Sequence, residues 1–277
     1  MVKKNTHFGK SSDLKEALEE IFRSYHDPQY LGLDPLICVH RYRKSSDIEI
    51  VGLLAAGLAY GRVEIVIRSI ERVLSIMGSS PTSFVAEASF KEKCRLLGDF
   101  KHRFNDGRDI ATLLQSVAGV TREYGTLERC FRAGLETSGG DLSGALELFT
   151  GVIRENGRKL AGERKSFEYL VASPAGGSAA KRMALYLRWM VRKEDGIDLG
   201  IWKSVSPSVL VMPVDTHVAR IAAVSGLSKR KVADWRMAQE ITSMLRTFDP
   251  EDPVKYDFSL CRAGMLHFRG AGGDLEQ

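Results

Sequence analysis

The sequence predicts an all-α protein. Apolar residues recur every three or four positions over most of the chain, whereas the alternating pattern of half-buried strands is scarce. Hydrophobic residues make up 44% of the 277 residues, which is enough to form the core of one large domain or of two lobes. Gly, Pro and helix-capping side chains separate the periodic stretches, so we expect about ten or more helices.

The expected helices follow from this periodicity in chain order. The pattern from Ile48 to Met77 is too long for one uncapped helix, and we expect it to break near Gly61. The other stretches are bounded by Gly, Pro or a capping residue. The predicted helices are Leu14–Tyr25, Ile48–Met77 with its break, Asp109–Tyr124, Leu127–Leu135, Leu142–Ile153, Ala179–Lys193, Thr216–Ser225, Lys231–Phe248 and Pro253–Phe268.

Composition limits the class of protein. The formal net charge of +5 permits a polyanionic partner without requiring one. The four cysteines are scattered, with no C-x-x-C pair and no His at metal-ligand spacing, so we expect no zinc site, no iron–sulfur cluster and no other cofactor.

The first 15 residues are polar and charged, and no apolar run is long enough to cross a bilayer. We therefore expect a reduced, cytoplasmic protein without a membrane segment, and a monomer.

A glycine loop, Ser173–Ser178, interrupts the helical pattern before the helix expected from Ala179. Its paired glycines, Gly176 and Gly177, can adopt positive φ, and the backbone N–H groups that lead into the helix can bind a phosphate. An ordinary turn between two helices is the alternative that this pattern leaves open.

Two residues near predicted helix starts are candidates for catalytic chemistry. Asp215 follows an apolar stretch that ends at Pro213, and at an N-cap its carboxylate would be held in fixed geometry and favoured in its ionised form. Lys181 lies on the first turn after the glycine loop, where the helix dipole disfavours an ammonium and favours the neutral, nucleophilic amine. Asp215 can also be a simple cap, and Lys181 a solvated or phosphate-contacting side chain.

The segment Pro213–Arg220, which reads Pro-Val-Asp-Thr-His-Val-Ala-Arg, is similar to the V-D-[TV]-H segment of helix-hairpin-helix DNA glycosylases. In that superfamily a Lys that follows a Gly-rich hairpin attacks the sugar, and an Asp at the start of a later helix completes the site. The resemblance implies these roles for Lys181 and Asp215, and a contact between His217 and a DNA phosphate. It covers chiefly residues 48–220, and it implies a two-lobed helical fold, with a barrel lobe from 40–205 and a second lobe formed by 1–39 and 206–277.

The sequence departs from this superfamily in several places. The usual L-P-G-[VI]-G-x-K hairpin is replaced by the Ser173–Lys181 segment, and Tyr60, Gly61 and Arg62 stand where a Gln or Asn is expected. The gap of 34 residues between Lys181 and Asp215 is similar to that of the archaeal 8-oxoguanine glycosylases. The cysteine cluster of the endonuclease III branch has no counterpart. Other segments, such as residues 188–192, 198–202 and 249–258, resemble a bacterial family of unknown function. This resemblance extends over most of the chain.

The implied function is that of a DNA glycosylase with AP lyase activity, which removes a damaged base through a Schiff base on Lys181. The long gap favours an oxidised purine. The partner would be damaged duplex DNA with the nucleotide flipped into a pocket. Residues expected to contact DNA are Gly176, Gly177, Ser178, Arg182, His217, Tyr60 and Arg62, and those expected to line the base pocket are Tyr256 and Phe258.

Other readings remain open for these residues. Each aromatic residue can belong to the core, and Arg182 can be a surface charge. The chain as a whole can be a catalytically inactive relative that binds nucleic acid, or an enzyme whose Lys181 reacts with a small carbonyl compound. The distance between the amine and the carboxylate separates the glycosylase from the inactive relative. The sign of the charge around the cleft separates the enzyme for small carbonyl compounds from both.

Overall fold

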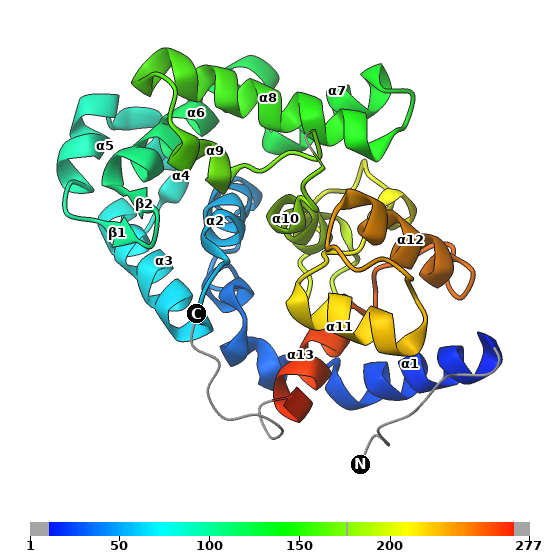
Figure 1. The fold of residues 1–277 in the computed structure, drawn as a ribbon. Helices are drawn as coiled ribbons and strands as arrows, with labels where there is room; N and C mark the ends of the chain where they lie inside the picture. The colour runs from blue at the N-terminus through cyan, green and yellow to red at the C-terminus, as the bar shows by residue number, and fades with distance from the viewer. Residues whose placement is uncertain (1–10, 176, 269–277) are drawn as a thin grey trace.

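The computed structural model describes residues 11–175 and 177–268. Within this part of the chain, thirteen α-helices and three short 3-10 helices form the regular structure, together with one two-stranded antiparallel hairpin. The prediction of an all-α protein is confirmed. Figure 1 shows the arrangement of these elements.

The bounds of the elements up to α6 are α1 (Ser11–Tyr25), η1 (Pro28–Leu33), η2 (Pro35–Cys38), α2 (Ser45–Leu58), α3 (Val63–Met77), α4 (Pro81–Glu87), α5 (Phe90–Leu96), β1 (Lys101–His102), β2 (Asn105–Asp106) and α6 (Gly107–Tyr124). The remaining elements are α7 (Leu127–Thr137), α8 (Leu142–Ala161), α9 (Lys165–Leu170), α10 (Lys181–Val191), η3 (Pro207–Val209), α11 (Thr216–Ser225), α12 (Trp235–Arg246) and α13 (Asp257–Phe268).

Each predicted helix overlaps an observed one, and the break near Gly61 lies between α2 and α3, where Gly61 has a φ of +98°. Three predicted helices begin too early. Ala180 has a left-handed backbone, Asp234 is the N-cap of α12, and the residues before Asp257 form turns. The short helices α4, α5 and α9 were not predicted, because six or seven residues contain too little of the helical period to be recognised.

Helices α2 and α10 form the centre of the molecule. In Figure 1 they lie between α4–α9 on one side and α1, α11, α12 and α13 on the other. Helix α2 is buried on nearly all sides, which agrees with its almost uninterrupted apolar sequence. At Gly52 the two helices come so close that a Cβ would lie 2.9 Å from Met190 Cε. The side chain of Tyr186 on α10 also donates a hydrogen bond to the carbonyl oxygen of Glu49 on α2.

The two ends of the described chain meet. Helix α1 packs against α13, and α13 also packs against α11. Leu14 and Leu18 of α1 belong to the same hydrophobic cluster as residues of α2, α6, α8 and α10. One continuous core therefore runs through both predicted lobes, and the division into lobes stays a prediction. None of the helices within 11–175 and 177–268 has the length and apolar character that crossing a membrane requires.

Candidate active site

The starts of α10 and α11 bring Lys181 and Asp215 together. Lys181 is the first residue of α10, and Asp215 is the N-cap of α11. Lys181 Nζ donates to Asp215 Oδ2 over 3.4 Å. The lysine side chain is 35% exposed and the aspartate side chain 13%, so the amine is accessible from solvent while the carboxylate lies deeper. The structure thus brings together the two residues that the sequence singled out.

Asp215 is held by local structure. Its Oδ1 accepts hydrogen bonds from the backbone N–H groups of His217 and Val218, at 2.9 and 2.8 Å, as an N-cap does. Its Oδ2 faces Lys181 and the thiol of Cys261, whose Sγ lies 3.8 Å away. Burial by itself would raise the pKa of Asp215, but Lys181 and the Val218 N–H outweigh it and lower the pKa below its ordinary value. The carboxylate is therefore ionised and fixed in direction.

The loop before Lys181 differs from the predicted phosphate loop. Gly177 has the expected positive φ, +84°, but its N–H donates to the carbonyl oxygen of Pro174 at 2.9 Å. Ser178 forms an isolated antiparallel bridge with Asp234, and its Oγ accepts from the N–H of Ala180. The N–H of Gly177 is therefore already used within the turn. Gly176, for which the same role was predicted, lies outside the described residues.

A pocket of about 90 Å³ opens beside the Lys181–Asp215 pair. Its walls combine apolar side chains from several elements with a group of charged ones. The residues that line it are Leu33, Asp34, Pro35, Ala59, Gly61, Val63, Val66, Lys181, Leu185, Arg188, Pro213, Asp215, Asp257, Cys261, Arg262 and Met265. The pocket is thus built from η1, η2, the α2–α3 loop, α3, α10, the start of α11 and α13.

Sequence reasoning missed the part of this pocket that α13 supplies. Asp257 and Cys261 are four residues apart, so they lie on one face of α13 and reach the same pocket. Burial raises the pKa of Asp257 to about 6, although Arg188 beside it opposes the shift. Burial also raises the pKa of the Cys261 thiol to about 12, which keeps it protonated. Their spacing on α13 was the only sequence signal for them.

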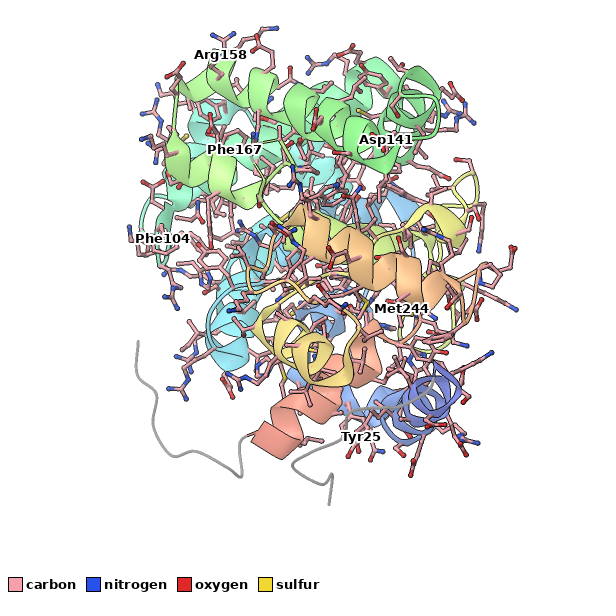
Figure 2. All side chains as sticks on the ribbon, turned by 45° about the vertical axis from the view of Figure 1, so that its right-hand side comes forward. Tyr25, Phe104, Asp141, Arg158, Phe167 and Met244 are labelled. Carbon is pink, nitrogen blue, oxygen red and sulfur yellow. The ribbon has the colours of Figure 1, made fainter. Side chains whose placement is uncertain are left out.

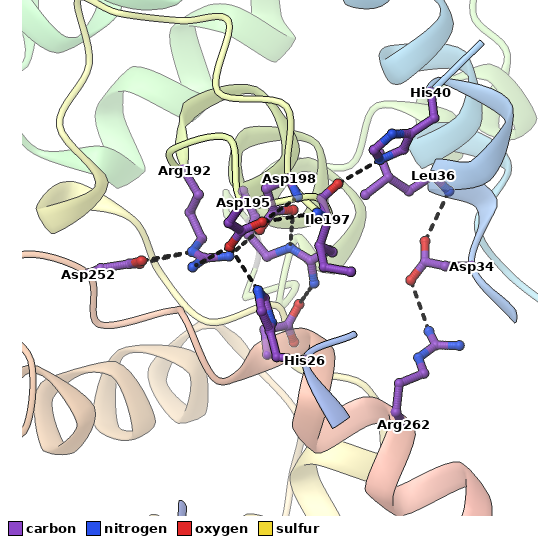
Figure 3. A network of polar contacts seen from close by, with 12 residues as sticks. His26, Asp34, Leu36, His40, Arg192, Asp195, Ile197, Asp198, Asp252 and Arg262 are labelled. Atoms are coloured by element: carbon purple, nitrogen blue, oxygen red, sulfur yellow. Dashed lines mark hydrogen bonds and ion pairs between the residues drawn. The ribbon is translucent and has the colours of Figure 1, made fainter. Parts of the chain in front are cut away.

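Buried ion pairs lie below the pocket. Arg188 binds Asp198 at 3.0 Å and also contacts Asp257, so this guanidinium links α10 to the start of α13. Arg262 on α13 pairs with Asp34 at 2.9 Å, and Figure 3 shows this pair beside the larger group around Asp198. The floor of the site is therefore fixed by charged contacts between distant segments.

Arg182 does not fit its predicted role as a phosphate contact. Its side chain is buried, donates to the carbonyl oxygen of Gly57 at 3.1 Å, and lies 3.8 Å from the centre of the Tyr169 ring. Burial lowers the pKa of Arg182, and the tyrosines oppose this only in part. The prediction was wrong because the local sequence does not distinguish an arginine on the side of α10 that faces the protein interior from one that faces solvent.

Tyr60 belongs to a group of three rings that we call the aromatic cluster: Tyr60, Phe104 and Tyr169. Tyr60 stacks on Phe104 with the ring centres 5.7 Å apart, and Tyr169 meets both rings edge-on. The Tyr60 hydroxyl donates to the carbonyl oxygen of His102, which anchors the ring to the β1–β2 hairpin. Phe104 is 57% and Tyr169 41% exposed, and Figure 2 shows Phe104 at the edge of the molecule.

Tyr256 and Phe258 do not line the pocket, and the prediction of a base pocket there is wrong. Both side chains are almost fully buried. The Tyr256 hydroxyl donates to Glu19 of α1, and the Phe258 ring meets His26 edge-on. These aromatics join the two chain ends because α13 and the turn before it lie against α1, a long-range contact that the local sequence does not encode.

Arg62 and His217, the other predicted DNA contacts, lie near the pocket. Arg62 is the N-cap residue of α3, with a side chain that is 85% exposed and 4.0 Å from Glu64. His217 lies in the first turn of α11 and is partly buried. In the part of the chain that the structure describes, no group of three or more His, Cys, Asp or Glu side chains is placed to hold a metal ion.

Comparison with protein families gives a match, whereas the other two comparisons do not. No curated protein matches the chain. No solved structure matches it either. The family that matches is DUF2400, described as a protein of unknown function, over residues 34–266. This stretch covers most of the chain and includes Lys181, Asp215 and every residue that lines the pocket beside them except Leu33. The chain therefore belongs to the DUF2400 family of proteins of unknown function.

Proposed function

We propose that the chain is a DNA-processing enzyme of the glycosylase and AP lyase type, in which Lys181 forms a Schiff base with the sugar of a damaged nucleotide. The observation that carries this proposal is the Lys181–Asp215 pair, 3.4 Å apart at two helix starts beside a pocket. An accessible amine can act as a nucleophile, and the oriented carboxylate beside it can stabilise the positive charge that develops on the substrate.

The chemistry follows from the two groups. The Lys181 ammonium first passes a proton to solvent, and the amine then attacks C1′ of the sugar and displaces the base, which leaves with the electron pair of its bond to C1′, or adds to the aldehyde of a sugar that has lost its base. In the first case, the C1′–O4′ bond of the sugar ring breaks and O4′ takes up a proton as the imine forms; in the second case, loss of water from the carbinolamine gives the same imine. Removal of a proton from C2′ then expels the 3′ phosphate, and water hydrolyses the imine to restore the lysine. Asp215 stabilises the positive charge that develops at C1′ and on the imine nitrogen.

The aromatic cluster supports a nucleic acid as the partner. It adjoins the pocket, because Ala59 and Gly61 on either side of Tyr60 line the pocket wall. Arg103 lies over the Phe104 ring, with its guanidinium carbon 5.7 Å from the ring centre, and Arg62 is exposed nearby in sequence to Tyr60. Exposed rings beside cations are suited to stacked bases and a phosphate backbone.

The test is borohydride trapping on duplex and single-stranded oligonucleotides that carry 8-oxoguanine, uracil or an abasic site. We expect wild-type protein to give a covalent adduct with at least one substrate. Lys181→Arg keeps the charge that pairs with Asp215 but cannot form an imine, so the adduct should vanish while the fold and DNA binding remain. Lys159→Ala changes an exposed lysine on α8 and should trap like the wild type.

The outcome also tests the alternative function. Salt-sensitive binding without an adduct on any substrate would overturn the enzymatic proposal and favour a nucleic-acid-binding protein without catalysis. Trapping that persists in Lys181→Arg would show that another amine reacts. Asp215→Asn should retain the N-cap of α11 and lose at least tenfold in trapping rate, because an amide accepts the same hydrogen bonds without the charge.

A further inference from the structure

The pocket beside Lys181 contains another carboxylate that the proposed chemistry does not use. Asp257 is the first residue of α13 and lines the same pocket as Lys181 and Asp215. Its Oδ2 contacts the guanidinium of Arg188. Its other oxygen, Oδ1, accepts no hydrogen bond from any residue that the structure describes. One side of this carboxylate is therefore held in place, while the other is open to a molecule in the pocket.

The other two carboxylates that line the pocket have both oxygens occupied. Asp34 accepts from a backbone N–H with Oδ1 and from Arg262 with Oδ2. Asp215 accepts from two backbone N–H groups with Oδ1, and its Oδ2 faces Lys181. Of the carboxylates that line the pocket, Asp257 is thus the one with an uncommitted oxygen.

Asp215 and Asp257 have pKa values that are shifted in opposite directions. Burial alone would raise the pKa of Asp215, but Lys181 and the Val218 N–H outweigh it and lower the pKa. Burial raises the pKa of Asp257 to about 6, and Asp215 adds to the rise while Arg188 opposes it. Two carboxylates of one pocket whose pKa values are pushed apart can divide their roles between a permanent charge and a proton carrier.

One proton transfer of the proposed reaction still lacks a group. Once the imine has formed, a base must remove a proton from C2′, the carbon next to C1′. Asp215 is a weak base because its pKa is lowered, and its Oδ2 already faces the amine. Burial raises the pKa of the Cys261 thiol to about 12, so this group keeps its own proton at neutral pH. A carboxylate with a pKa of about 6 is ionised at neutral pH and is a stronger base than Asp215.

We infer that Asp257 is the general base of strand cleavage and removes the C2′ proton from the imine on Lys181. This inference rests on the proposed function and adds a catalytic residue to it. The C2′–H bond breaks and its proton goes to Oδ1 of Asp257. The electron pair of that bond forms the C2′–C3′ double bond, and the C3′–O bond breaks so that the 3′ phosphate leaves with its electrons. Asp257 then passes the proton to solvent.

The charged and titratable groups around Asp257 come from several elements. They are Arg188 and Lys181 of α10, Asp215 at the start of α11, Cys261 and Arg262 of α13, Asp34 between η1 and η2, Asp198 on the far side of Arg188, Glu19 of α1, and His26 directly after α1. Arg188 contacts Asp257 directly, whereas Glu19 and His26 bind other partners. Burial and Arg188 therefore dominate the pH at which Asp257 takes up a proton.

The experiment separates imine formation from strand cleavage. A duplex with a preformed abasic site is mixed with excess protein. Borohydride trapping measures the imine, and cleavage without borohydride measures the later step. The same duplex with deuterium at C2′ reports on the proton transfer. The variants are Asp257→Asn, whose amide oxygen can still accept from Arg188, Asp215→Asn, and the matched control Asp13→Asn, which changes an exposed aspartate of α1.

We expect Asp257→Asn to be trapped within about threefold of the wild-type rate but to cleave about 100-fold more slowly, as for loss of a general base. Asp215→Asn should lose trapping and cleavage together, and Asp13→Asn should match the wild type. In the wild type, cleavage of the formed imine should slow as the pH falls below about 6, because Asp257 becomes protonated. Deuterium at C2′ should slow the same step about twofold or more.

Equal losses of trapping and cleavage in Asp257→Asn would indicate a structural role and overturn the inference, and so would cleavage at the wild-type rate. If circular dichroism shows that Asp257→Asn does not fold, the wild type decides. Cleavage of its imine that is insensitive to deuterium, or to pH between about 5 and about 8, would then overturn the inference. All these outcomes leave Lys181 as the nucleophile. No wild-type adduct on any substrate would overturn the proposed function as well.

Discussion

Gly177 shows how a single residue shapes the approach to the candidate site. Its φ of +84° places it in the left-handed region, although nothing lies within 4 Å of the position of a Cβ. Gly151 is a useful contrast, because it is an exposed glycine inside α8 with the same open space around it. A Cβ therefore meets backbone strain at one position and none at the other.

We predict opposite effects for the same substitution at these two glycines. Gly177→Ala should lower the free energy of unfolding by about 1 kcal/mol, because alanine is strained at positive φ. Gly151→Ala should raise it by about 0.5–1 kcal/mol, because alanine favours the helix and restricts the unfolded chain. Urea denaturation of both variants measures the difference. Equal changes of the same sign would show that the loop backbone is not held in this conformation.

At this scale, the sequence singled out Lys181 and Asp215 but not their surroundings. Lys181 and Asp215 were recognisable because each lies at a helix start that Gly, Pro or a cap marks in the local sequence. Arg182 and Tyr256 were misassigned, since a side chain's burial depends on which helix covers it. Asp257 and Cys261 came to the site from a helix more than 40 residues beyond Asp215.

Among the elements, α7 depends on a side chain from α2. Glu49 Oε1 accepts from the N–H of Glu128 at 2.9 Å and from the indole N–H of Trp202 at 2.8 Å, while Oε2 accepts from the N–H of Leu127. The first turn of α7 thus receives a negative charge at the positive end of its dipole. Burial raises the pKa of Glu49, although these three donors oppose the shift.

We predict that Glu49→Ala lowers the free energy of unfolding by about 2–4 kcal/mol, because three donors, two of them buried, lose their acceptor. Glu49→Gln should lose less, since its amide oxygen still accepts from some of them. The control is Glu136→Ala, an exposed residue on α7 that should change stability by no more than about 0.5 kcal/mol. Guanidinium denaturation distinguishes the three. A loss in Glu49→Ala no larger than in the control would refute the cap.

Across the whole molecule, a network of ions joins segments that are far apart in the chain. Figure 3 shows Asp195 between His26 at the end of α1 and Arg192 after α10, and Arg192 bound in turn to Asp252 before α13. Burial alone would raise the pKa of Asp195, but His26, Arg192 and the N–H of Asp198 hold it well below its ordinary value.

This lowered pKa predicts a dependence of stability on pH. An aspartate whose pKa is depressed by folding stabilises the protein above the unfolded value of 3.8, and the stabilisation is lost as the pH falls through lower values. We expect wild type to exceed Asp195→Asn by about 1–3 kcal/mol at pH 7, and the difference to shrink below about pH 4. Urea denaturation from pH 7 to pH 3 measures it. A difference that stays constant over this range would contradict the assignment.

The sequence by itself determined that the chain is helical, where most helices lie, that Lys181 lies near the start of one helix and that Asp215 precedes another. These properties depend on periodicity and capping within a few residues, which the local sequence contains. Only the tertiary structure decided that the two side chains meet at 3.4 Å, that α13 completes their pocket, and that Tyr256 and Phe258 join the chain ends instead of lining it. Those outcomes depend on the packing of helices against one another, and packing is set by contacts between residues distant in the sequence.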